Sequence, residues 1–321
     1  MSDSSPPLVT VLGGGGFIGR YVCEALLRHG ARLRVAQRDP RRAWFLQPLG
    51  SVGQVSVTAA DMRRPETIER AVEGADAVVN LVGVFDGDLD AIHVSGPRHA
   101  AEFAQRGGAR AFVHLSAIGA DPASGSRYGR TKGEGEGAVR AAFPAATILR
   151  PSLVFGAEDQ LTNRFAGLAG FPVMPVIAPK TRFQPVFVGD IGAATARAAL
   201  DPEKYGGKSF DLAGPEVVTM RELIERIATM AGRAPAYVDL PDPAARAIAS
   251  LGFLPGAPLT KDQWLMLQRD NVAAADSKGL EAFGIAPTAL AVASEWLGRF
   301  MKGGRFARRA TTSSPASDPA G

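Results

Sequence analysis

The stretch LVTVLGGGGFIGRYV, residues 8–22, decides the fold of this chain. It opens with apolar, β-prone residues and passes through a turn in which Gly13, Gly16 and Gly19 recur every three positions. It then continues with apolar residues at helical spacing. Glycines suit such a turn because it requires unusual backbone dihedral angles and lets another group approach the main chain without meeting a Cβ atom. The stretch therefore predicts a buried strand, a tight turn and a helix.

A helix that begins directly after such a turn presents free backbone N–H groups and the positive end of its dipole to whatever lies in front of it. We therefore expect a diphosphate to bind here, in contact with Gly13, Gly16, Phe17, Ile18 and Gly19. A glycine pattern alone is a weak signal, but its place between a strand and a helix at the start of an α/β pattern makes it specific.

The rest of the first half repeats the alternation of strand and helix. β-Prone runs occupy residues 8–12, 33–37, 54–60, 76–82, 110–116 and 146–150, and amphipathic helical patterns occupy 17–29, 66–73, 89–106 and 128–142. Such alternation predicts an α/β fold with a Rossmann-type, doubly wound parallel sheet over residues 8–150. The pattern then becomes irregular, and we expect residues 151–301 to form a smaller C-terminal α/β lobe interleaved with the sheet.

Composition limits the classes of protein to which the chain can belong. Of its 321 residues, 46% are hydrophobic, which is enough for a full core. The single cysteine, Cys23, excludes a disulfide within the chain, and its apolar helical surroundings predict a buried thiol. The four histidines lack the paired spacing of metal ligands, so we expect no metal. A net charge of +4 gives no strong support for nucleic-acid binding.

The two ends of the chain are expected to be irregular. Residues 1–7 lack the basic and apolar regions of a secretory signal, and we expect them to be flexible. Residues 302–321 begin with a basic cluster and continue rich in Thr, Ser, Pro and Ala, which indicates a disordered tail or a weak contact with anionic lipid. No apolar run approaches the roughly 18 residues of a membrane span, so we expect a cytoplasmic protein, soluble or peripheral.

The end of the second strand bears on the choice of nucleotide. An NAD-binding domain usually carries an acidic residue about 20 residues beyond the glycine turn, which binds the ribose hydroxyls. This chain has Arg38 there instead, and a guanidinium can hold the 2′-phosphate of NADP(H). Asp39 follows and could reach a ribose, so NADP(H) is preferred and NAD(H) stays open. Arg41 and Arg42 either assist or belong to a solvated loop.

Two further strand ends are expected to line the nucleotide. Asp61 ends the third strand, where its carboxylate can accept a hydrogen bond from the adenine amino group; the alternative is a turn or capping residue for the helix at Pro65. Leu81, Val82 and Gly83 end the fourth strand beside the diphosphate crevice, because ligands of open α/β sheets bind at the carboxyl ends of the strands.

Tyr128 and Lys132 lie four residues apart and therefore share one face of the predicted helix. Lys132 can reach the nicotinamide ribose, and its ammonium favours the tyrosinate form of Tyr128, which makes an acid/base pair in outline. Ser116, at the end of the fifth strand, is the available hydroxyl for a substrate carbonyl, but position 117, which faces the other way, holds an alanine. We expect Ser116, Tyr128 and Lys132 to bind the nucleotide, with catalysis as the open alternative.

The same helix is unusually rich in glycine. Each glycine in a helix interior costs about 1 kcal/mol relative to alanine, so something must compensate. Gly129, Gly133 and Gly137 recur every four residues and predict a groove for close approach by the sheet, a second helix or a partner; the alternative is a frayed, exposed helix. Glu134 and Glu136 lie two apart, on different faces, and are expected to be solvated.

These features together resemble the extended and atypical short-chain dehydrogenase/reductase superfamily. The resemblance rests on the glycine turn, Asp61, the NLVG strand end, Tyr128 with Lys132, Arg150-Pro151 followed by VFG, and Arg182-Phe183 leading to Val188 and Asp190. It covers roughly residues 8–300. It implies a nicotinamide-dinucleotide site that also includes Pro151.

A narrower resemblance is to the NADPH-binding accessory subunits of respiratory complex I and their bacterial relatives. It rests on GGGGFIGRYV, VNLVGVF, HLSAIGADPASGSRYGRTKGEGEG and above all TRFQPVFVGDI combined with the RDNV of LTKDQWLMLQRDNV. This resemblance implies NADPH in a structural role and complex I subunits as partners, at the cytoplasmic face of a bacterial inner membrane. Segment 241–259 is a candidate docking surface, and so is the apolar patch 264–267, for which packing in the core is the default interpretation. The alternative is an oxidoreductase, epimerase or dehydratase acting on a carbonyl or a quinone precursor.

Overall fold

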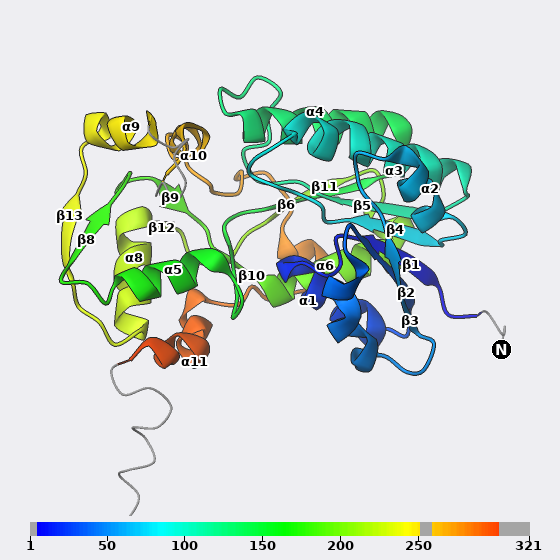
Figure 1. Ribbon diagram of the computed structural model, residues 1–321, viewed down its shortest axis with the longest axis horizontal. Helices are drawn as coiled ribbons and strands as arrows, with labels where there is room; N and C mark the ends of the chain where they lie inside the picture. Colours follow the sequence, from blue (N-terminus) through cyan, green and yellow to red (C-terminus); the bar gives the residue numbers. More distant parts are fainter. Residues whose placement is uncertain (1–4, 251–258, 302–321) are drawn as a thin grey trace, which may run out of the picture.

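The computed structural model describes residues 5–250 and 259–301. Its centre is a seven-stranded parallel sheet with the order β11-β6-β5-β4-β1-β2-β3 (Figure 1). The strands are β1 (Leu8–Leu12), β2 (Arg32–Gln37), β3 (Val55–Ala59), β4 (Ala77–Asn80), β5 (Ala111–Leu115), β6 (Thr147–Pro151) and β11 (Ser209–Leu212). The predicted α/β class is confirmed, and the six expected strands form within about two residues of their predicted limits.

Helices cover both faces of the sheet. On one face lie α2 (Pro65–Val72), α3 (Gly96–Arg106) and α4 (Arg127–Ala142), and on the other lie α1 (Phe17–Arg28) and α6 (Val188–Leu200) (Figure 1). Alternation along β5 decides which layer each side chain meets: Val113 joins the core under α1 and α6, whereas Phe112 joins the core under α2, α3 and α4. Cys23 is buried in the first of these cores, as predicted, and burial raises the pKa of its thiol to about 12.

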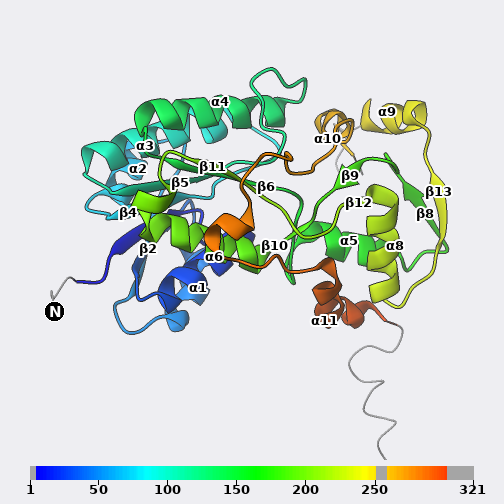
Figure 2. The same ribbon diagram turned by 180° about the vertical axis from the view of Figure 1, so that it is seen from behind.

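The remaining elements build a smaller lobe beside the sheet. Its helices are α5 (Gln160–Leu168), α8 (Met220–Met230), α9 (Asp242–Ser250), α10 (Lys261–Met266) and α11 (Ser294–Leu297). Its short strands pair as β7 (Val154–Phe155) with β10 (Val186–Phe187), β9 (Arg182–Phe183) with β12 (Val218–Thr219), and β8 (Val173–Val176) with β13 (Ala236–Asp239). Figure 2 shows α9 and α10 on the same side of the molecule as α4.

The chain passes between the two parts more than once. After β10 it forms α6, the short α7 (Pro202–Tyr205) and β11, which all belong to the sheet layers, before it returns to the smaller lobe. Short irregular helical segments complete the structure: η1 (Pro40–Leu49), η2 (Ala91–Ser95), η3 (Leu280–Phe283), η4 (Leu290–Ala293) and η5 (Gly298–Phe300). The lobe and the sheet are therefore interleaved, while the division of the chain at residue 150 stays a prediction.

No helix within residues 5–250 and 259–301 combines the length and apolar character that crossing a bilayer requires. Of the expected N-terminal segment 1–7, the structure describes residues 5–7, where the carbonyl oxygens of Pro6 and Pro7 accept hydrogen bonds from Arg32. The basic segment 302–321 and residues 251–258 of the candidate docking segment lie outside the described residues.

Candidate nucleotide site

The glycine turn after β1 does not accommodate side chains at Gly13 and Gly19. Gly13 has a φ of +83°, a conformation that residues with a Cβ atom rarely adopt. A Cβ atom on Gly19 would lie 2.4 Å from a backbone carbonyl oxygen of the same turn. Gly16 is the N-cap residue of α1 and provides no side-chain cap, so it leaves the first N–H groups of the helix, those of Phe17 and Ile18 among them, to a ligand or solvent. The turn therefore has the shape and the donors that a diphosphate needs.

The end of β2 lies against this turn and is followed by the predicted phosphate ligand. A Cβ atom on Gly15 would lie 2.1 Å from Oε1 of Gln37, so Gln37 covers this glycine directly. Arg41 is bound to the Asp39 carboxylate at 2.9 Å. Arg38 is exposed and forms no ion pair with another residue of the described chain. Arg38 therefore has a guanidinium that a 2′-phosphate can reach.

Asp61 follows β3 and takes part in the turn before α2. Its carboxylate accepts hydrogen bonds from the backbone N–H and the guanidinium of Arg63, at 3.0 and 2.6 Å, and its carbonyl oxygen accepts the N–H of Arg64. The bonds with Arg63, with a smaller effect of Arg38, lower the pKa of Asp61 to about 2. These contacts match the turn interpretation, and the contact of Asp61 with adenine stays a prediction.

Asn80, the last residue of β4, shapes the segment that follows it. Its side-chain oxygen accepts the N–H of Val82 at 3.2 Å, and its amide nitrogen lies 3.1 Å from Nδ1 of His114 on β5. Both Asn80 and His114 are buried, and this contact satisfies Nδ1 of His114, whereas its Nε2 has no hydrogen-bond partner among the described residues. Asn80 therefore positions the segment that follows β4 from inside the sheet, a role that its place at a strand end does not by itself indicate.

The segment Leu81 to Gly83 joins the two halves of the site. A Cβ atom on Gly13 would lie 3.2 Å from Cγ2 of Val82, and one on Gly83 would lie 3.3 Å from Nζ of Lys132. The glycine turn, the end of β4 and Lys132 therefore line one continuous surface at the carboxyl edge of the sheet, which is where open α/β sheets bind ligands.

Tyr128 and Lys132 lie on one face of α4, as their spacing predicts. Nζ of Lys132 lies 5.9 Å from the centre of the Tyr128 ring and donates a hydrogen bond to the Leu115 carbonyl oxygen at 3.0 Å. Ser116 is the next residue after Leu115; it is buried, and its hydroxyl has no hydrogen-bond partner among the described residues. The structure thus brings Ser116, Tyr128 and Lys132 to the same strand end, where one buried polar group is left for a ligand.

Burial controls the charge of the Tyr128 and Lys132 pair. It raises the pKa of the Tyr128 phenol to about 12, and it lowers the pKa of the Lys132 ammonium to about 8 against the opposing effect of Glu136. Lys132 is therefore mostly charged at neutral pH, and Tyr128 keeps its proton. The shift toward tyrosinate expected from Lys132 is not seen, because desolvation dominates the pKa of the phenol.

Two aromatic rings that sequence reasoning did not single out enclose Tyr128. Phe85 stacks on it with ring centres 4.7 Å apart, and His93 meets it edge-on at 5.4 Å. Nε2 of His93 accepts the N–H of Val84, and its Nδ1 lies 2.9 Å from the Thr131 hydroxyl. Burial lowers the pKa of His93 to about 3, so the ring is neutral. Phe85 falls within the VNLVGVF stretch, and that stretch is the feature of the sequence that could have pointed to it.

Comparison with known proteins identifies the family. Residues 13–161 match a family model described as NAD(P)H-binding. NADH dehydrogenase (ubiquinone) 1 alpha subcomplex subunit 9 of mouse mitochondria is 34% identical over 302 residues, which cover 91% of this chain and 80% of the mouse protein. The chain belongs to the family of this subunit 9. It is an NAD(P)H-binding protein of the short-chain dehydrogenase/reductase type.

Relatives of the subunit 9 family include an enzyme. The ceramide reductase of Caulobacter vibrioides is 31% identical over 249 residues, which cover 76% of each chain. Among solved structures, an NADPH-dependent quinone oxidoreductase of Escherichia coli in complex with NADPH aligns with a TM-score of 0.74 and 20% identity, over 90% of this chain and 99% of that one. The structural likeness supports the fold.

Three glycines of α4 mark close contacts in this member of the subunit 9 family. Gly129 and Gly133 lie against loop 119–124, where added Cβ atoms would be 2.7 and 2.5 Å from the nearest atoms. A Cβ atom on Gly135 would lie 2.0 Å from a carbonyl oxygen of η2, whereas one on Gly137 would meet nothing within 4 Å. The predicted groove is thus filled by the chain itself, and Gly135 rather than Gly137 meets a second helical segment.

The expectation that Glu136 is solvated is wrong. Glu136 is 3% exposed and binds the Arg150 guanidinium through two bonds of 2.8 and 2.5 Å, with Arg140 at 3.5 Å. This ion pair fastens α4 to β6 and raises the pKa of Arg150. Glu134, in contrast, forms a half-exposed pair with Arg130 at 3.4 Å. The two carboxylates do lie on different faces, but one face is buried.

The stretches RFQPV and RDNV contribute residues to a set of contacts at the end of β6. Pro151 is buried there, and its carbonyl oxygen accepts a backbone N–H from the loop after β5. The guanidinium of Arg182, from RFQPV, pairs with Asp270, from RDNV, at 2.7 Å. The neighbouring Asn271 accepts the hydroxyl of Ser152 at 2.7 Å. These residues join the sheet to the smaller lobe, and contact of Pro151 with a nucleotide stays a prediction.

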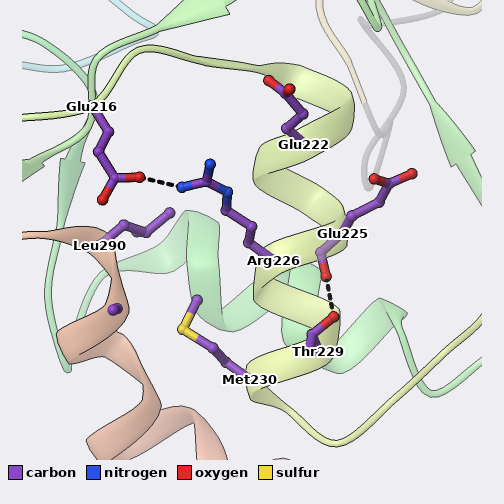
Figure 3. A pocket seen from close by; sticks show the side chains of 8 residues that line it. Glu216, Glu222, Glu225, Arg226, Thr229, Met230 and Leu290 are labelled. Atoms are coloured by element: carbon purple, nitrogen blue, oxygen red, sulfur yellow. Dashed lines mark hydrogen bonds and ion pairs between the residues drawn. The ribbon is translucent and has the colours of Figure 1, made fainter.

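The rest of the described chain offers little other chemistry. No group of three or more His, Cys, Asp or Glu in residues 5–250 and 259–301 is arranged to hold a metal ion. An open depression of about 520 Å³ lies along α8 in the smaller lobe (Figure 3). Its acidic side chains are already engaged: Glu216 with Arg226, Glu222 with the N-cap residue Thr219, and Glu225 with Arg221.

Proposed function

We propose that this protein is an accessory or assembly subunit of respiratory complex I that binds NADP(H) tightly in a structural role, at the cytoplasmic face of a bacterial inner membrane. The observation that carries the proposal is the 34% identity with subunit 9 of the mouse mitochondrial enzyme along 91% of this chain. That match spans the smaller lobe as well as the sheet, which supports a shared docking role beyond a shared nucleotide fold.

The residues at the site fit NADPH. In this proposal the diphosphate lies on the N–H groups of Phe17 and Ile18, the 2′-phosphate on Arg38, and the nicotinamide ribose near Lys132. NADPH supplies a hydride where an acceptor is present. The protein contributes donors that face the phosphates and a glycine turn without side chains. The turn admits no side chain at Gly19, because a Cβ atom there would lie 2.4 Å from a backbone oxygen.

The surroundings of Tyr128 favour a structural nucleotide over a reacting one. Phe85 covers one face of the ring and His93 meets it edge-on, at centre distances of 4.7 and 5.4 Å. The phenol, with a pKa of about 12, keeps its proton at neutral pH. A reductase would need the same protonated form as a proton donor, so the ring contacts and not the protonation of Tyr128 favour the structural role. Tyr128 then serves chiefly as an apolar and hydrogen-bonding wall for the nicotinamide.

Affinity isolation from membranes tests the proposal directly. The tagged full-length protein is purified from the native organism after gentle detergent solubilisation, and both its protein partners and its bound nucleotide are identified by mass spectrometry. We expect complex I subunits together with NADPH at near-stoichiometric occupancy. A preparation that carries nucleotide but recovers no respiratory subunit would contradict the assignment to the complex.

A reductase is the second candidate, and one observation favours it. The buried Ser116 hydroxyl has no partner among the described residues and lies one residue beyond the carbonyl that Lys132 holds. Such a hydroxyl can bind a substrate carbonyl, and the 31% identical relative in Caulobacter vibrioides is a ceramide reductase. NADPH oxidation by a ketone or quinone, lost in Tyr128→Phe and in Ser116→Ala, would establish this function in place of the first.

Arg38→Ala should weaken NADPH binding about thirtyfold and leave NADH binding within about twofold. The guanidinium-phosphate bond is worth about 2 kcal/mol, and NADH lacks the phosphate that makes it. Fluorescence titration of both nucleotides measures the two affinities. Arg41→Ala is the matched control, because that guanidinium is already bound to Asp39. An equal loss for both nucleotides would exclude Arg38 as the phosphate ligand.

The affinity for NADPH should fall as the pH rises through about 8, the pKa of Lys132. Only the ammonium form offers a charged donor to the ribose, so binding is full below this pKa and weakens above it as the proton is lost. Calorimetric titration at several pH values measures the effect. Lys132→Met should bind more weakly and show no such dependence; a wild-type affinity that stays constant through pH 9 would contradict this role for Lys132.

A further inference from the structure

The N-terminus of α4, which carries Tyr128, is held by a residue of the smaller lobe. The Asp262 carboxylate of α10 accepts hydrogen bonds from the N–H of Arg127 at 2.6 Å, the N–H of Tyr128 at 3.1 Å and the hydroxyl of Ser126 at 3.0 Å. Ser126 is itself the N-cap residue, and its hydroxyl oxygen accepts the N–H of Gly129. A carboxylate at this place also meets the positive end of the α4 dipole.

This contact is one of several that segment 260–273 of the smaller lobe makes with the sheet domain. In Figure 1, α10 lies between α9 and the start of α4. Beyond α10, Arg269 pairs with Asp121 at 3.4 Å, and the side-chain amide of Asn271 donates to the Ile118 carbonyl oxygen at 3.2 Å. Asp121 and Ile118 both lie in the connection between β5 and α4. Segment 260–273 therefore contacts the connection between β5 and α4 near the start, the middle and the end of that connection.

We propose that Asp262 is a positioning residue of the nucleotide site: from the smaller lobe it fixes the first turn of α4 and so places Tyr128 against the nicotinamide end of the bound nucleotide. This inference rests on the proposed binding of NADPH. The backbone N–H of Tyr128 is itself bound by Asp262, so the carboxylate constrains the backbone that carries the ring. The adenine end of the site, at Arg38 and the glycine turn, is built from β1, β2 and α1 and lies outside this contact.

Two ligands separate an effect on the nicotinamide end from a general loss of structure. NADPH occupies both ends of the site, whereas adenosine 2′,5′-bisphosphate carries the adenine-end phosphates and lacks nicotinamide. Asp262→Ala removes both acceptor oxygens, and Asp262→Asn keeps one neutral acceptor for the helix. Asp242→Asn is the matched control, because the Asp242 carboxylate binds Trp264 and Gln268 beside the same helix and does not bond to α4.

In the full-length protein, Asp262→Ala should weaken NADPH binding about tenfold, with Asp262→Asn between it and the wild type. Binding of the bisphosphate should change by no more than about twofold, and Asp242→Asn should match the wild type for both ligands. The nicotinamide fluorescence of bound NADPH should move toward that of free NADPH.

The outcomes distinguish a failure of the positioning role of Asp262 from a failure of the proposed nucleotide binding. An unchanged NADPH affinity in Asp262→Ala, or an equal loss for both ligands in Asp262→Asn, overturns the positioning role. Where Asp262→Ala does not fold, Asp262→Asn decides by the same comparison, since it retains a helix-capping side chain. If the folded wild-type protein binds neither ligand, the proposed nucleotide function fails instead.

Discussion

Gly135→Ala should lower the free energy of unfolding by about 3 kcal/mol, whereas Gly137→Ala, two positions further along α4, should raise it by about 1 kcal/mol. An alanine Cβ atom at position 135 would lie 2.0 Å from the carbonyl oxygen of His93, so α4 and η2 would have to separate. At position 137 nothing lies within 4 Å of the added atom, and alanine there brings only its better helix propensity.

Urea unfolding followed by circular dichroism measures both changes. Each variant is the control for the other, because both replace glycine by alanine in the same helix. Gly135→Ala should also weaken NADPH binding, since η2 carries His93, which packs against Tyr128. Stabilisation by both substitutions would mean that α4 and η2 do not pack closely and that the glycines serve no contact.

Glu136→Ala should lower the free energy of unfolding by about 3 kcal/mol. The substitution leaves the Arg150 guanidinium without the carboxylate that binds it at 2.5 and 2.8 Å. Removing one partner of a buried ion pair costs about 3–5 kcal/mol, and the lower end applies because the Arg150 side chain is 32% exposed and can recover some hydration. The loss should accompany a looser attachment of α4 to β6, measurable as faster amide hydrogen exchange in β6.

Glu134→Ala is the control for Glu136→Ala. Its pair with Arg130 is half-exposed and spans 3.4 Å, so its loss should change stability by no more than about 0.5 kcal/mol. A double-mutant cycle with Arg150→Met isolates the charge effect: the cost of Glu136→Ala should shrink in that background. An undiminished cost would show that Glu136 acts through packing and not through Arg150.

Local features of the fold could be predicted because neighbouring residues encode them. The apolar run Leu8 to Leu12 and the glycines after it place β1 and α1 at their observed limits. The spacing of Tyr128 and Lys132 correctly puts both on one helix face. Each of these inferences needs only the period of a strand, a helix or a turn.

The rest of the site depends on partners that are distant in sequence. Asn80 and His114 are 34 positions apart, and Asp262 lies 136 positions from Ser126, so no periodicity links them. A glutamate in a glycine-rich helix looks the same in sequence whether water or Arg150 faces it, which is why Glu136 was misjudged. Gly137 fitted the four-residue spacing better than Gly135, yet the tertiary neighbour, η2, decides which glycine is needed.

The return of the chain to the sheet after β10 has a consequence for biosynthesis. Ile191 and Ala194 of α6 share one core with Val9 and Val11 of β1, and β11 pairs with β6 at the edge of the sheet. A nascent chain that has just left the ribosome as far as residue 150 still exposes the part of one apolar sheet face that α6 later covers, and the outer edge of β6 still lacks its partner β11. The nucleotide-binding half can therefore reach its final form only after translation has passed Leu212, and until then this face and edge are open to association with other chains.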